Sequence, residues 1–167
     1  MNNNDQRILD LIAERLENVG IYSEPAEYGG EAALELIFDS EDEFAPKECT
    51  VTVIHPKDDM TVIQLLVTML HTEDEETVDK LCSLLPELNS LLSIGSFGVM
   101  RSDGYMYYNY AFLTEPLDEG SMLESFGAAL QVVSATAIRC GELLSGFMSE
   151  KDGADEGRHD DYSIVQF

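Results

Sequence analysis

The spacing of hydrophobic residues changes along the chain and predicts an ordered series of helices and strands. Asn4 or Asp5 can cap a first helix that Gly20 ends, because apolar residues recur every three to four positions between them. Ser23 to Gly30 contains Pro25 and a Gly-Gly pair, which are typical of a loop. Apolar residues then alternate with period two in three predicted strands, Ala33 to Asp39, Cys49 to His55 and Met60 to Leu70.

Short connections between these three strands favour an antiparallel meander. Met60 to Leu70 is apolar on both faces, so we expect this strand at the centre of the sheet. Thr72 and Glu75 have the spacing of a capping box, which predicts the start of a second helix. Pro86 cannot continue that helix without a kink.

The segment from Ser93 to Leu113 is predicted to form a hairpin, because Asp103-Gly104 separates two runs of apolar and aromatic residues. Its second strand carries aromatic residues on both faces. We expect the two sets to divide between the core and a partner or dimer surface, and the sequence leaves open which set is exposed. One set is Tyr105 and Tyr107, and the other is Tyr108, Tyr110 and Phe112.

A long helix is predicted from Asp118 to about Met148. Its apolar seam has heptad spacing and includes Leu123, Phe126, Leu130, Val133, Leu144 and Phe147. The positions beside the seam hold small residues rather than the charged residues of a free coiled coil. This pattern favours a helix packed flat on the sheet over a helix–helix dimer, and one face of the helix is a candidate dimer or client surface.

These elements give one α+β domain over residues 1–148, with an antiparallel five-stranded sheet in the order α-β-β-β-α-β-β-α and the long C-terminal helix packed on the sheet. Residues 149–167 are polar and acidic, and we expect a mobile tail. The tail closes with a short strand-like stretch, Tyr162 to Phe167, for which docking and a loose end are both open.

The charge of the chain restricts its partners. Acidic residues number 33 against 9 basic residues, for a net charge of −24, and the basic residues form no cluster. Nucleic acid and anionic membranes are therefore not expected as partners. A basic or apolar segment of another protein suits this charge, although acidity also serves solubility alone.

Cysteine usage and the N-terminus indicate the expected compartment. The three cysteines Cys49, Cys82 and Cys140 lie far apart in apolar surroundings, which suggests buried thiols in a reducing cytoplasm. The first residues lack the charged-then-apolar pattern of a signal peptide. We therefore expect a cytoplasmic protein.

Motifs for catalysis are missing from the sequence: there is no nucleophile elbow and no phosphate-binding loop. His71 with the acidic run Glu73 to Glu76 fits a helix N-terminus better than a metal site. Glu41 to Glu43 lacks the ligand pattern of a calcium loop. We expect no enzyme, no metal and no cofactor, although an active site built from distant residues stays open.

The element order, the acidic character and the segment from Leu88 to Phe112 resemble the YbjN family. In that family a helix end with leucine and asparagine, here Leu88-Asn89, leads to a strand, an Asp-Gly turn and an aromatic strand. The resemblance covers Asp5 to Met148. It implies a fold like that of type III secretion chaperones and a non-enzymatic domain, often homodimeric, that binds secretion substrates or has a regulatory role.

Together these observations predict a non-catalytic, acidic protein-binding module, a homodimeric chaperone-like or regulatory adaptor. Its partners would be a second copy of itself and an unfolded or basic protein segment. The alternative is a regulatory domain that senses a small molecule in a pocket between a helix and the sheet.

Overall fold

A computed structural model describes residues 3–38, 45–57, 60–114 and 117–149, with side chains up to residue 146. The described residues form an α+β fold with one antiparallel sheet in the strand order β1-β2-β3-β4-β6-β5. The helices are α1 (Asn3–Asn18), α2 (Glu75–Ser90) and α3 (Glu119–Ser149). The strands are β1 (Ser23–Tyr28), β2 (Glu31–Ile37), β3 (Glu48–Lys57), β4 (Met60–His71), β5 (Ser96–Met100) and β6 (Tyr105–Leu113).

The α+β class, the antiparallel sheet and the C-terminal helix are confirmed, but the expectation of five strands is wrong. Residues 23–28 form the edge strand β1 instead of a loop, so the sheet has six strands and the order is α-β-β-β-β-α-β-β-α. Gly29 and Gly30 both have positive φ, at 62° and 87°, which suits a two-residue hairpin turn. Pro25 is tolerated because β1 lies at the edge of the sheet.

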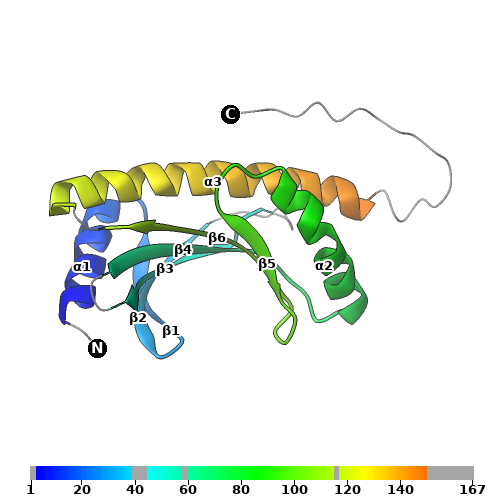
Figure 1. The fold of residues 1–167 in the computed structure, drawn as a ribbon, viewed down its shortest axis with the longest axis horizontal. Helices are drawn as coiled ribbons and strands as arrows, with labels where there is room; N and C mark the ends of the chain where they lie inside the picture. The colour runs from blue at the N-terminus through cyan, green and yellow to red at the C-terminus, as the bar shows by residue number, and fades with distance from the viewer. Residues whose placement is uncertain (1–2, 39–44, 58–59, 115–116, 150–167) are drawn as a thin grey trace.

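All three helices bury apolar side chains in one core on one side of the sheet. Figure 1 shows α3 running along the sheet, α1 crossing it near β1 to β3, and α2 beside β5. Both ends of the sheet bend away from α3, so the opposite face is concave (Figure 1). Ile12, Leu65, Phe126 and Val133 are almost fully buried in this one-sided core. Each such side chain contributes about 1.5–3 kcal/mol through burial.

The central place of β4 is confirmed. β4 pairs with β3 on one side and with β6 on the other. Its core face carries Ile63, Leu65 and Val67, and its concave face carries Val62 and Leu66, which neighbouring side chains cover to 8% and 9% exposure. Because β4 lies between two long strands, the side chains of those strands cover its second face, and no helix is needed on that face.

The expected capping box at Thr72 and Glu75 is wrong, because Asp74 caps α2. The Asp74 carboxylate accepts hydrogen bonds from the Thr77 amide at 2.9 Å and from the Thr77 hydroxyl at 2.6 Å, and these bonds lower the pKa of Asp74. A carboxylate satisfies the free amides and also complements the positive end of the helix dipole. The helix then continues through Pro86 as far as Ser90.

The turn between β5 and β6 contacts the junction of β4 and α2. Gly104 is buried with φ +67°, and its carbonyl accepts a hydrogen bond from the Thr72 amide at 3.0 Å. A Cβ on Gly104 would lie 1.8 Å from the Thr72 carbonyl oxygen, so glycine is required for space as well as conformation. The Asp-Gly pair therefore fixes the hairpin tip against the start of α2.

One side chain forms hydrogen bonds with the backbone of β5 at its outer edge. The Phe97 amide donates to Asn89 Oδ1 at 2.6 Å, and Asn89 Nδ2 donates to the Phe97 carbonyl at 3.1 Å. The carboxamide thus pairs with Phe97 as a residue of a neighbouring strand would. Exposed strand edges pair readily with other chains, so this contact protects β5 and also ties it to the end of α2.

Replacing Asn89 with alanine is expected to lower the free energy of unfolding by about 1–3 kcal/mol, because both backbone groups of Phe97 lose their partner. Urea denaturation followed by circular dichroism measures the change. Ser90→Ala is the matched control, since the exposed Ser90 hydroxyl donates to the Glu87 carbonyl within the same helix. Equal losses in the two variants would contradict a specific role for the Asn89 bridge.

Candidate functional site

The aromatic residues of β6 divide between the two faces of the sheet. Tyr108 is fully buried on the core face, where its hydroxyl donates to the Ile94 carbonyl at 2.9 Å and its ring tilts against Phe97. Tyr110 and Phe112 lie on the same face, packed against the core but half-buried. Their partial exposure marks the end of β6 where the cover provided by the helices is incomplete.

Tyr105 and Tyr107 lie on the concave face. The Tyr105 ring stacks on His71 with 4.4 Å between centroids. The Tyr107 ring lies across Gly98, because a Cβ on Gly98 would come within 2.4 Å of the ring and its hydroxyl. Because Gly98 has no side chain, it leaves the space that the Tyr107 ring occupies.

The apolar seam of α3 faces the sheet. Phe126, Leu130, Val133 and Leu144 are buried, and Leu123 is partly buried against the core. Phe147 lies in α3 beyond the side chains that the structure describes. The seam is therefore occupied by the sheet of its own chain, and a partner can only reach the other faces of this helix.

The last part of β6 forms an open sheet edge. Pairing with β5 ends at Ser96–Asn109, whereas β6 continues to Leu113. The Thr114 amide donates to the Thr61 carbonyl of β4, so by strand alternation the amides of Ala111 and Leu113 point away from β4. In the part of the chain that the structure describes, no strand pairs with residues 110–113 on that side.

An apolar groove of about 360 Å³ lies between this open edge and α3. Val132 is 41% exposed in the groove, and Leu113 is 50% exposed beside it. Along α3, exposed apolar residues continue from the groove as far as Ile138. The groove is lined by Tyr110, Phe112, Leu113, Ser125, Ala128, Ala129 and Val132, none of which carries a charge.

The concave face carries a chain of polar side chains. The Thr52 hydroxyl donates to Gln64 Oε1 at 3.4 Å, and Gln64 Nε2 donates to Asn109 Oδ1 at 2.8 Å. These bonds link β3, β4 and β6 across the face. Toward β3 the Thr68 hydroxyl donates to Glu48 Oε1 at 2.9 Å. Each of these polar groups is hydrogen-bonded to a neighbouring strand, which fixes its position on the face.

Three carboxylates meet on the concave face near β1 to β3. Glu24 is the direct cross-strand partner of Glu35, and Glu48 lies on the neighbouring strand. The hydrogen bond with Glu48, followed by partial burial and by the charges of Glu48 and Glu24, raises the pKa of Glu35 above its ordinary value of 4.5. Like charges on directly opposed strand positions destabilise a sheet, so this arrangement has a stability cost.

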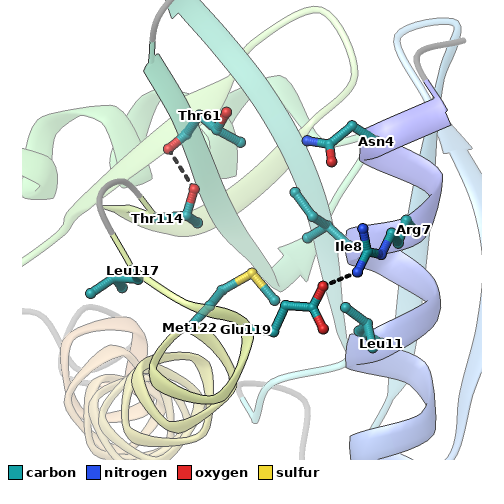
Figure 2. A pocket seen from close by; sticks show the side chains of 9 residues that line it. All are labelled: Asn4, Arg7, Ile8, Leu11, Thr61, Thr114, Leu117, Glu119 and Met122. Carbon is teal, nitrogen blue, oxygen red and sulfur yellow. Dashed lines mark hydrogen bonds and ion pairs between the residues drawn. The ribbon is translucent and has the colours of Figure 1, made fainter.

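A small cavity lies where α1, the start of α3 and the ends of β4 and β6 meet (Figure 2). The ion pair of Arg7 with Glu119 spans one side, and the Thr114 hydroxyl donates to the Thr61 carbonyl at 3.1 Å on the other. The volume is about 180 Å³. Ligand pockets are typically about 300–1,000 Å³, so this cavity is small for a ligand-sensing site.

No metal site is found among the described residues, and two of the three thiols are buried. No group of three His, Cys, Asp or Glu side chains there is placed to hold a metal ion, and Glu41 to Glu43 lie outside the described ranges. Burial raises the pKa of Cys49 to about 12 and that of Cys140 to about 11. Both thiols are therefore protonated and poor nucleophiles near neutral pH.

By length and hydropathy, α3 from Glu119 to Gly146 would also suit a membrane-crossing helix, and one third of its most apolar window is buried. Core helices pass the same test. The contacts of α3 with β4 and β6 explain its apolar seam without a bilayer.

Compared with known proteins, the chain matches no family model, and no curated protein sequence matches it significantly. The resemblance to the YbjN family therefore stays a prediction.

The sequence analysis identified the aromatic residues but missed the carboxylates of the concave face. Glu24 lies in the stretch expected to be a loop, so its alignment with Glu35 was hidden. Glu35 itself lay in the predicted strand Ala33 to Asp39, which corresponds to β2. The Gly-Gly pair was the signal for the hairpin that brings β1 beside it.

A test of the carboxylate cluster follows from the pKa of Glu35. A raised carboxyl pKa means that the folded protein holds this proton more tightly than the unfolded chain does. Stability from this group is present below pH 4.5 and is lost as the pH rises through the raised value. Glu35→Gln is expected to melt at a higher temperature than the wild type near neutral pH, with the difference vanishing toward about pH 4.

Thermal denaturation across this pH range measures the effect. Glu31→Gln is the matched control, because Glu31 lies exposed on the same strand. A similar gain in both variants at neutral pH would mean that net charge alone, and not the Glu35 cluster, causes the destabilisation.

Proposed function

We propose that the protein is a non-catalytic protein-binding module that acts as a homodimeric, chaperone-like or regulatory adaptor. The observation that carries the proposal is the open edge of β6 at residues 110–113 beside an uncharged apolar groove. Strand addition at such an edge gives backbone hydrogen bonds, and the groove accepts side chains of the added segment. A protein partner uses both features, whereas a small molecule bound in the groove would leave the backbone groups of the open edge unpaired.

A second copy of the chain is the partner that we assign to this edge. Two β6 strands can pair antiparallel about a twofold axis, because each contributes the same outward amides at Ala111 and Leu113. The exposed apolar residues of α3, from Ala128 to Ile138, would then lie beside the new pair. The uncharged character of this region also favours self-association in a chain of net charge −24, where charged surfaces repel each other.

The alternative function, a small-molecule sensor, needs a pocket with convergent polar groups, and the cavity of Figure 2 is one candidate for it. That cavity is small, and the Arg7–Glu119 ion pair lies in its wall. Protein binding is therefore the better-supported proposal.

Sedimentation equilibrium at micromolar concentrations tests the dimer. Val132→Glu places a charge in the groove of each copy and is expected to raise the dimer dissociation constant roughly tenfold to a hundredfold. Gln131→Glu adds the same charge at the adjacent exposed position of α3 and is expected to have little effect. A wild-type protein that sediments as a monomer would contradict the proposal.

The pairing of β6 has its own test. Ala111→Pro removes an outward amide and is expected to give a folded monomer, because the lost donor does not belong to the pairing with β4. Ala111→Val retains the amide and should remain dimeric. Circular dichroism confirms that the variants are folded, and an unchanged dimer in Ala111→Pro would place the interface elsewhere.

A further inference from the structure

The concave face changes its chemistry in a regular way from one edge of the sheet to the other. The strand registers align Glu24, Glu35, Thr50, Leu66 and Asn109 in one row across β1, β2, β3, β4 and β6. The next row runs from Ile37 through Glu48, Thr68 and Tyr107 to Gly98. Carboxylates thus lie on β1 to β3, hydroxyl and amide groups lie in the middle of the face beside Leu66, and tyrosine rings lie on β6.

This face is not covered by the described parts of the chain. The core contacts of α1 and α3 are with the opposite face, and α2 packs beside β5. Figure 1 shows both ends of the sheet bending away from α3, and we use the name trough for this concave face of the sheet. Polar groups in the trough are nevertheless fixed by cross-strand hydrogen bonds, such as that from Gln64 to Asn109.

The carboxylates of the trough have no cationic partner within the described chain. The ion pairs among described residues join other side chains, such as Lys80 with Glu76 and Arg101 with Asp79. Glu24, Glu35 and Glu48 instead lie close to one another. Positive charge supplied from outside would relieve this repulsion, so the charge of the trough favours a cationic occupant.

The aromatic end of the trough suits the same occupant. Tyr107 lies over Gly98, and Tyr105 stacks with His71. Tyrosine faces attract Lys and Arg side chains through cation–π contacts. Two strand spacings, about 10 Å, separate the positions of Glu48 and Tyr107, and about three residues of an extended chain span that distance.

We propose that the concave face binds a lysine- or arginine-rich segment of a partner protein, with Glu35 and Glu48 pairing with its cations and Tyr107 packing on a basic side chain. This inference rests on the proposed protein-binding function and names the partner's chemistry and the surface that it uses. The binding surface is distinct from the β6 edge, so each dimer would present two troughs.

Fluorescence anisotropy with a labelled peptide of alternating lysine and serine residues tests the proposal on the full-length protein. The wild type is expected to bind this peptide and not the corresponding glutamate–serine peptide. The double variant Glu35→Gln/Glu48→Gln is expected to bind roughly five- to twentyfold more weakly, because two charge pairs are lost. Tyr107→Ala is expected to weaken binding roughly threefold to tenfold, while Tyr107→Phe retains the ring and the affinity.

The matched control is Glu14→Gln/Glu17→Gln, which removes two charges from the exposed side of α1, on the other side of the sheet. Equal losses in both double variants would show that the peptide binds the overall negative charge and would overturn the inference, as would a wild type that does not bind. Binding of the peptide by Ala111→Pro, whether this variant is a monomer or a dimer, would support the trough independently of the dimer interface. The two proposals can therefore fail separately.

Discussion

Burial of all three helices against one face of the sheet is the constraint on which the structure depends. Strands β3, β4 and β6 each present an apolar stripe to α1 or α3, and the core is closed by this single layer of helices. The other face must then remain compatible with water, which explains its threonine, glutamine, asparagine and glutamate side chains. A chain of this length can form a core in this way with only two layers.

The same arrangement explains why the protein tolerates repulsion on its concave face. Glu24, Glu35 and Glu48 are near one another at the β1–β3 end, away from the densely packed centre at β4. Natural sequences carry such local costs where a surface has another task, while the core supplies the stability. The hydrogen bonds among Thr52, Gln64 and Asn109 keep the rest of the face in one arrangement.

Sequence periodicity was sufficient for most of the fold and for only part of the site. The alternation in β4, the Asp-Gly turn at Gly104 and the seam of α3 predicted the central strand, the hairpin and the packed helix, because each signal is local. β1 was missed because Pro25 argues against a strand unless its edge position is known, and that position is a property of the whole sheet.

The candidate site depends even more on long-range pairing. The two faces of β6 followed from alternation, but the covered face was identified only through contacts with Phe97 and α3. The row that joins Glu48, Thr68 and Tyr107 draws on three strands, and β4 and β6 are separated by α2 in the chain. Spacing within one segment carries no information about such a row.

The Asn89 carboxamide has a consequence for how large an assembly of this protein can become. A sheet with two bare edges can add chains at both ends without limit, which is the route to fibrils. Here the Asn89 carboxamide forms hydrogen bonds with the backbone amide and carbonyl of Phe97 in β5. At the opposite edge of the sheet, Pro25 of β1 has no amide hydrogen to donate. Residues 110–113 of β6 lie open beside the apolar groove, and one twofold pairing would use both copies of this length. A single asparagine thus favours a closed, finite complex over lateral growth.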